Sequence, residues 1–69
     1  MSYDVICEDY RHSQDFEART VSGVKTYDEA QRIADQYIEK YHNVGPTIMV
    51  FIYDRKINRS ICVFDGADQ

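Results

Sequence analysis

The sequence predicts a small α+β protein: a four-stranded, mainly antiparallel sheet with one helix packed on one face. Four β-prone segments and one amphipathic helical segment between the second and third of them support this prediction. The chain has 69 residues, of which 43% are hydrophobic, enough for one domain with a modest core. We therefore expect a single domain over residues 1–69 with the element order β-β-α-β-β.

The first two strands are expected over residues 3–10 and 16–22, because apolar and polar side chains roughly alternate in both. The short polar connection between them predicts a hairpin. In the second strand, Phe16 and Ala18 share a face, and Gly23 is expected to end the strand.

The helix begins at Thr26, which forms a capping-box pattern with Glu29 three residues later. The apolar residues that follow recur at spacings of three and four and line one stripe: Tyr27, Ala30, Ile33, Ala34, Tyr37, Ile38 and Tyr41. The helix should end near His42 or Asn43, because Gly-Pro follows shortly afterwards.

The third strand is expected over residues 47–53, which are apolar on both faces and therefore typical of a central strand. A polar turn at residues 54–56 leads to the last strand, residues 57–64. Residues 65–69 are expected to form a frayed tail.

One helix can cover only one face of a four-stranded sheet. Alternation assigns the following residues to the covered face: Val5, Cys7, Phe16, Ala18, Ile48, Val50, Ile52, Ile61 and Val63. It leaves on the uncovered face Ile6, Tyr10, Val21, Met49, Phe51, Tyr53, Cys62 and Phe64. The reverse assignment of the third strand stays open, but either choice leaves large apolar groups uncovered. Such a patch is typical of an interaction surface, although strand curvature and loops that fold over it are the alternative.

The net charge of −4 comes from the first seventeen residues, which hold five acids and one base. This balance argues against direct binding of nucleic acid, which requires clustered Lys and Arg. A solvated surface is one reading of the acids, and an acidic patch that docks on a basic protein surface is the other. On the second reading the partner-binding residues are Glu8, Asp9, Tyr10, Asp15, Glu17, Met49, Phe51, Tyr53 and Phe64.

The sequence offers little support for catalysis, so we expect a non-enzymatic protein without cofactor. It has no glycine-rich phosphate loop, and its few histidines lack an orienting acid that the sequence can identify. Two distant cysteines do not make a disulfide framework, and we expect both to be reduced. A zinc site of Cys7, His12, His42 and Cys62 lacks the close ligand pairs of such sites.

The element order, with the helix entry T-Y-D-E-A-Q-R-I-A-D-Q-Y and the strand T-I-M-V-F-I-Y-D, resembles small anti-defence and host-takeover proteins of bacteriophages, including certain anti-CRISPR proteins and phage antitoxins. The resemblance covers residues 3–64 and lies in the pattern of elements, so it assigns no functional residues. It implies a stoichiometric inhibitor that occupies a surface on a larger bacterial or phage machine. Some members of this group are basic whereas this chain is acidic, which leaves the target open.

Together these observations predict a small protein-binding module that blocks a nucleic-acid-handling or defence complex sterically and electrostatically. A structural homodimer, or a subunit of a larger assembly, is the alternative function. The N-terminal residues contain no secretion signal and no apolar run reaches membrane-spanning length, so we expect a cytoplasmic protein, in the host cytoplasm if a phage encodes it.

Overall fold

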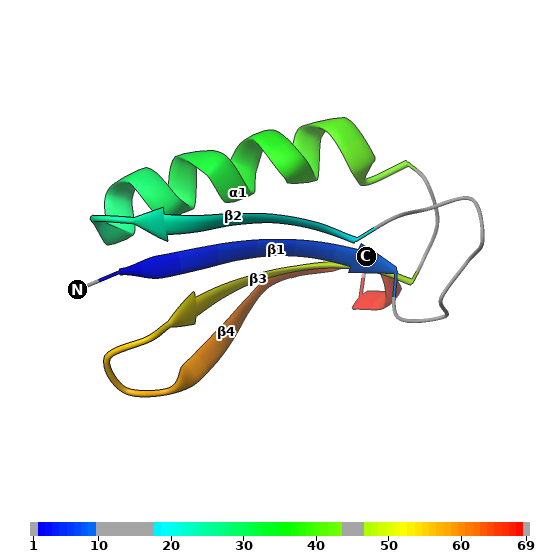
Figure 1. Cartoon of the computed structure of the whole chain (residues 1–69). Coiled ribbons are helices and arrows are strands. Elements are labelled where there is room, and N and C mark those ends of the chain that lie inside the picture. Colours follow the sequence, from blue (N-terminus) through cyan, green and yellow to red (C-terminus); the bar gives the residue numbers. More distant parts are fainter. Residues whose placement is uncertain (1, 10–17, 44–46, 69) are drawn as a thin grey trace.

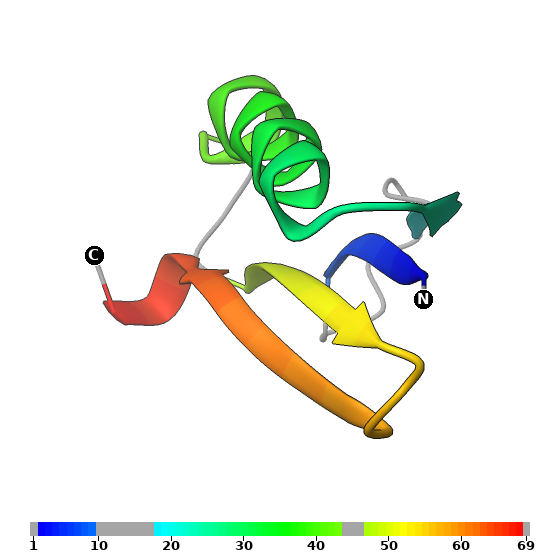
Figure 2. The same ribbon diagram turned by 90° about the vertical axis from the view of Figure 1, so that its left-hand side faces the viewer.

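The computed structural model describes residues 2–9, 18–43 and 47–68 and confirms the predicted α+β class. The elements in chain order are β1 (Tyr3–Asp9), β2 (Arg19–Val24), α1 (Tyr27–Tyr41), β3 (Ile48–Asp54), β4 (Arg59–Asp65) and the short 3-10 helix η1 (Gly66–Asp68). The strands form one sheet in the order β2-β1-β3-β4, and each neighbouring pair is antiparallel (Figure 1). The helix lies against one side of this sheet, as the end-on view in Figure 2 shows.

The ends of α1 are fixed by side chains at the residues that the sequence indicates. The hydroxyl of Thr26 accepts a hydrogen bond from the backbone N–H of Glu29 at 3.2 Å, as an N-cap should. At the other end, the backbone N–H of His42 donates to the carbonyl of Ile38. The Nδ1 atom of His42 also lies 2.9 Å from the same carbonyl oxygen and 3.1 Å from that of Glu39, so a proton on Nδ1 satisfies carbonyls of the last turn.

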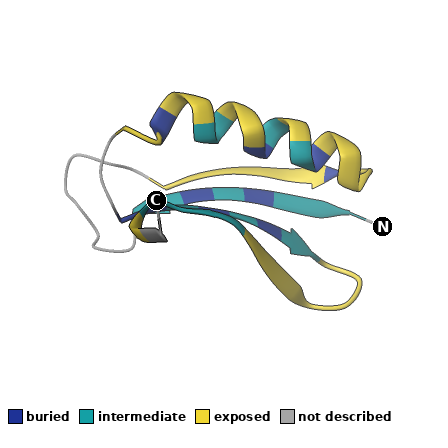
Figure 3. Cartoon of the chain, turned by 180° about the vertical axis from the view of Figure 1, so that it is seen from behind, coloured by how far each residue is buried: buried dark blue, intermediate teal, exposed yellow. Residues whose placement is uncertain are grey.

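The core lies between α1 and the two central strands. The fully buried strand residues alternate along β1 and β3, because alternate side chains of a strand point to the same face: Val5, Cys7, Ile48, Val50 and Ile52. Ala30 and Ala34 bring the helix backbone close to them, and Tyr41 closes one end. At the other end, Tyr27 packs edge-on against Tyr3 with ring centroids 5.8 Å apart. Buried segments on α1, β1 and β3 face one another in Figure 3.

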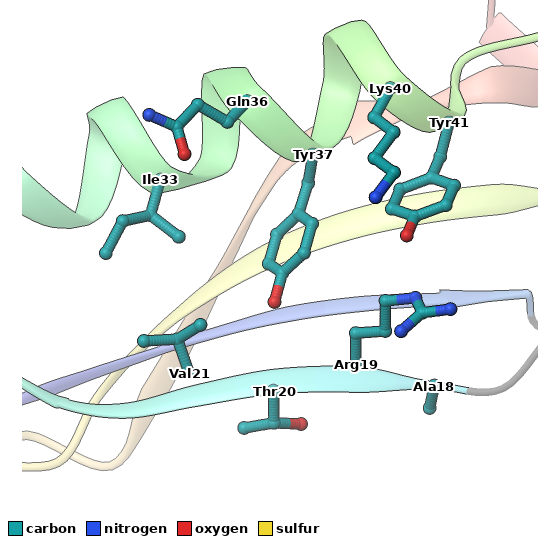
Figure 4. A pocket seen from close by; sticks show the side chains of 9 residues that line it. All are labelled: Ala18, Arg19, Thr20, Val21, Ile33, Gln36, Tyr37, Lys40 and Tyr41. Carbon is teal, nitrogen blue, oxygen red and sulfur yellow. The ribbon is translucent and has the colours of Figure 1, made fainter.

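The face assigned to the second strand is wrong, because alternation gives two sets of side chains without saying which set faces the helix, and the pairing with β1 selects the set of Val21. Nearer its end, β2 also contains one extra residue. Tyr3 pairs with Val24 but Val5 pairs with Val21, so two steps along β1 match three along β2. Gly23 adopts a φ of 73° in this irregular stretch and continues the strand instead of ending it. Val21 therefore lies opposite Val5 on the helix-facing side, whereas Ala18 is exposed and turns away from the helix (Figure 4). Phe16 lies outside the described residues.

A second bulge, in β4, places Phe64 on the opposite face of the sheet from the one predicted. Val50 pairs with Phe64 and Phe51 with Cys62, so Val63 is the extra residue of β4. Residues directly opposite in a ladder share a face, so Phe64 lies with Val50 on the helix-facing side, where it packs against the core. The prediction that Phe64 points to the uncovered face is wrong, because alternation cannot reveal an inserted residue.

Regular structure also extends beyond Phe64, where the sequence predicts the end of the last strand. Asp65 belongs to β4 and residues Gly66–Asp68 form η1. The carboxylate of Asp65 accepts a hydrogen bond from the backbone N–H of Ala67 at 3.0 Å, which holds the start of this turn.

Candidate functional site

The face of the sheet opposite α1 is the candidate site, and we call it the outer face. It comprises alternate residues of β1 and β3 with their β4 neighbours: Asp4, Ile6, Glu8, Met49, Phe51, Tyr53, Ser60, Cys62 and Asp65. Ile6, Met49, Phe51 and Tyr53 are all half-buried, while the helix-facing residues between them are fully buried. These four side chains are therefore partly accessible to water rather than enclosed in a second core.

The strand register arranges the outer face in rows across the sheet. The middle row is apolar, since Phe51 lies between Ile6 on β1 and Cys62 on β4. In the next row Met49 lies between two acids, Glu8 and Asp65. Cross-strand neighbours are close enough for their side chains to interact, so a sulfur-containing apolar side chain is flanked on both sides by carboxylates.

The opposite end of the outer face has an acid that is already paired. Asp4 lies opposite Tyr53, and its Oδ2 accepts a hydrogen bond from Arg55 Nε at 3.0 Å. The side chain of Asp4 is 13% exposed and that of Arg55 54% exposed. The other carboxylate oxygen of Asp4 is buried, and no residue in the described part of the chain forms a hydrogen bond with it. The charge of Asp4 is thus offset within the fold, so the acidic character of the face lies at Glu8 and Asp65.

The β3–β4 turn fixes the orientation of Tyr53. The hydroxyl of Tyr53 donates a hydrogen bond to the side-chain oxygen of Asn58, which has a left-handed backbone with a φ of 53°. Asparagine tolerates that conformation better than most residues. The carboxylate of Asp54 accepts from the backbone N–H of Lys56 at 2.9 Å and completes the turn. The ring of Tyr53 is therefore anchored at its hydroxyl.

The structure separates the predicted partner-binding residues into three groups. Glu8, Met49, Phe51 and Tyr53 lie together on the outer face. Phe64 lies on the other side of the sheet, and so does Asp9, because it alternates with Glu8. The remaining predicted residues lie outside the part of the chain that the structure describes: Tyr10, Asp15 and Glu17.

Asp9 has a contact within the fold that its neighbour Glu8 does not share. Its carboxylate accepts a hydrogen bond from the hydroxyl of Thr47, a residue only 5% exposed just before β3. A buried hydroxyl needs a partner, so this carboxylate satisfies a polar group of the fold.

Ile6 and Asp65 are outer-face residues that are not among the predicted partner-binding residues. Ile6 alternates with Glu8 along the same strand, so the alternation that places Glu8 on the outer face also indicates Ile6. Asp65 reaches the outer face only because the bulge at Val63 shifts β4 by one residue. No signal in the sequence indicates that shift.

The two cysteines lie in different environments. Cys7 is fully buried on the helix side, whereas Cys62 is exposed and pairs with outer-face Phe51. Burial raises the pKa of the Cys7 thiol; nearby Arg19 acts in the opposite direction and Glu8 adds slightly to the rise. Because the sheet separates the two sulfur atoms, Cys7 and Cys62 cannot ligate one zinc ion together. Within residues 2–9, 18–43 and 47–68, no three His, Cys, Asp or Glu side chains are grouped as metal ligands.

Comparisons of this chain with protein-family models, with curated proteins and with solved structures find no match. Among the described residues, α1 is the longest helix, and neither its length nor its composition would let it cross a membrane. The function is therefore inferred from the geometry of the outer face.

Proposed function

We propose that this protein is a non-enzymatic protein-binding module whose outer face docks on a basic surface of a larger protein. One observation supports this above all: Met49 and Phe51 are partly exposed on the uncovered face, and Met49 lies between the carboxylates of Glu8 and Asp65. Apolar and aromatic side chains in the centre with charges around them are typical of protein interfaces.

The two parts of this face contribute differently to binding. Apolar surface removed from water contributes roughly 25 cal/mol per Å² before the costs of association. The carboxylates add mainly specificity and speed, because opposite charges attract partners over distances set by salt screening. A partner with Lys or Arg around an apolar depression would complement both features.

In this proposal the protein acts as a stoichiometric inhibitor. Basic protein surfaces commonly bind nucleic acid through its phosphates, so an acidic protein seated on such a surface would exclude the nucleic acid by volume and by charge. The resemblance of the element order in the sequence to phage anti-defence proteins is the reason to propose a target of the nucleic-acid-handling or defence class.

The proposal is tested by affinity capture from cells of the native host, followed by measured affinities for the captured protein. Phe51→Asp should weaken binding at least about tenfold, because it places a charge in the centre of the interface. Glu8→Lys should reduce mainly the association rate, and the wild-type rate should fall as salt rises. Ile57→Asp is the matched control, because Ile57 is 56% exposed in the β3–β4 turn. Equal binding by wild type and Phe51→Asp would contradict the proposal.

A homodimer through the same face is the alternative function. The apolar row favours self-association, but acids such as Glu8 and Asp65 around Met49 would be brought toward those of the second copy. Light scattering on the purified protein separates the two functions. A monomer supports the docking proposal, whereas a concentration-independent dimer that Phe51→Asp dissociates would replace it with self-assembly.

A further inference from the structure

A groove lies between α1 and β2, on the side of the sheet opposite the outer face (Figure 4). Its volume is about 610 Å³. One wall is the strand segment 18–21, and the other is a face of α1 with residues at spacings of three and four: Ile33, Gln36, Tyr37, Lys40 and Tyr41. The side chains of Arg19 and Val21 point from the strand toward the helix, because they alternate with Ala18 and Thr20.

Two cations converge at one end of this groove. The guanidinium of Arg19 lies 5.4 Å from the centroid of the Tyr41 ring, and Lys40 Nζ lies at the same distance from that centroid. An aromatic face attracts each cation, but the two cations repel each other. Among residues 2–9, 18–43 and 47–68, neither has a carboxylate within ion-pair distance. The described lining of the groove is thus positively charged, although the chain has a net charge of −4.

The other end of the groove is apolar, since Val21 and Ile33 line it. Between the two ends lies Tyr37. Burial is the main cause that raises the pKa of the Tyr37 hydroxyl, with Cys7 and Tyr41 adding to the rise and Arg19 opposing it. The hydroxyl therefore keeps its proton at neutral pH and can donate a hydrogen bond to an anion.

The strand wall of the groove is also an edge of the sheet. In the order β2-β1-β3-β4, the described part of β2 pairs only with β1. Its residues from Arg19 to Gly23 are all exposed. An edge strand presents unpaired backbone N–H and C=O groups on which an extended peptide can add as a further strand.

We propose that this groove binds an extended acidic peptide segment, which adds to the free edge of β2 and directs alternate side chains toward α1. One such side chain, an Asp or Glu, would lie between Arg19 and Lys40. The residue two positions away would be apolar and contact Val21 and Ile33. Because a strand rises about 3.3 Å per residue, four residues match the length of the strand wall. This surface is separate from the outer face, and the inference does not depend on the proposed function.

The direction of the added strand sets the order of the two anchors. In an antiparallel addition, the peptide residue opposite Val21 precedes the residue opposite Arg19, because the two chains run in opposite directions. The recognised pattern is then apolar-x-acidic. A parallel addition would read acidic-x-apolar.

The test uses fluorescence polarisation with the full chain and the labelled peptide Ser-Thr-Val-Thr-Glu-Thr-Ser, together with the same peptide carrying Gln in place of Glu. We expect saturable binding of the Glu peptide, at least about tenfold weaker binding of the Gln peptide, and loss of affinity between about 50 and about 500 mM salt. Lys40→Glu should weaken binding by a similar factor. Lys56→Glu, the same charge change in the exposed β3–β4 turn, should leave the affinity unchanged.

Backbone pairing is tested separately with a peptide that is N-methylated at a residue whose backbone N–H would point toward β2. Methylation removes a donor and should abolish binding if the peptide adds as a strand. Undiminished binding of the methylated peptide would overturn strand addition. Failure of both the Val-x-Glu peptide and the reversed Glu-x-Val peptide to bind at about 1 mM, or equal effects of Lys40→Glu and Lys56→Glu, would overturn the whole inference.

Discussion

The two faces of the sheet differ although the same strands supply both. Along β3, Ile48, Val50 and Ile52 are fully buried under α1, while Met49, Phe51 and Tyr53 between them remain half-buried on the outer face. A side chain's neighbours, rather than its hydropathy, decide whether it stabilises the fold. Removing Phe51 should therefore affect binding more than folding, and removing Val50 should do the reverse.

The largest difference in stability is expected between two substitutions that introduce the same charge at neighbouring positions of β3. Val50→Asp places a carboxylate in the core without a partner and should destabilise the fold by more than about 4 kcal/mol, most of the stability of a small domain. Phe51→Asp, one residue along on the outer face, should keep the folded far-UV circular dichroism spectrum. Loss of the folded spectrum in both variants would show that the outer face is a second core.

A smaller contrast is expected within the covered face, because α1 lies over the centre of the sheet. Ile52 and Ile61 are directly opposite each other, yet Ile52 is 0% and Ile61 44% exposed. Ile52→Ala should reduce the free energy of unfolding by about 2–5 kcal/mol. Ile61→Ala should reduce the free energy of unfolding by less than about 1.5 kcal/mol, since truncating this partly exposed side chain leaves little cavity. Urea unfolding measures both, and equal losses would mean that β4 is as well covered as β3.

The helix start allows a similar test with matched threonines. Thr26→Ala removes the hydroxyl that accepts from Glu29 N–H and should cost about 1 kcal/mol. Thr20→Ala, an exposed position of β2, should change the free energy of unfolding by less than about 0.5 kcal/mol. A Thr26→Ser variant should recover most of the loss, because serine caps as well as threonine.

The cysteines give the smallest expected difference, and it depends on pH. Because folding raises the pKa of Cys7, the folded state holds the thiol proton to higher pH than the unfolded state. This contribution to stability is complete below the ordinary thiol pKa and is lost as pH rises above it. In Cys7→Ala the free energy of unfolding should fall less steeply as pH rises in alkaline solution, whereas Cys62→Ala should leave this pH dependence unchanged. Thiol reagents should label exposed Cys62 much faster than buried Cys7.

The sequence predicts the regular parts of this fold but misses its irregular ones. The start of the helix follows from the capping pattern of Thr26 and Glu29, and its end from the Gly-Pro shortly beyond it; such local signals can be recognised in sequence. The faces of β1 and β3 follow from strict alternation, which also brings together Glu8, Met49, Phe51 and Tyr53. The errors of face all lie in edge strands: the pairing of β2 with β1 places Val21 rather than Ala18 on the helix side, and an extra residue in β4 places Phe64 there.

Such an insertion leaves no clear trace in a hydrophobic pattern, because it depends on which partner backbone groups are within reach. In the sequence Gly23 indicates the end of a strand, whereas in the structure its left-handed backbone lets the strand continue through the bulge. The groove beside β2 could not be predicted either. Arg19 approaches Tyr41 only because the register places it on the helix side.

The positions of the two bulges have a consequence for behaviour at high concentration. Each lies in an edge strand, β2 or β4, while β1 and β3 pair without interruption along their whole length. A bulge increases local twist and breaks the flat ladder that amyloid-like stacking requires. The edge of β2 can thus accept a short guest segment at residues 18–21 but is a poor template for endless fibre growth.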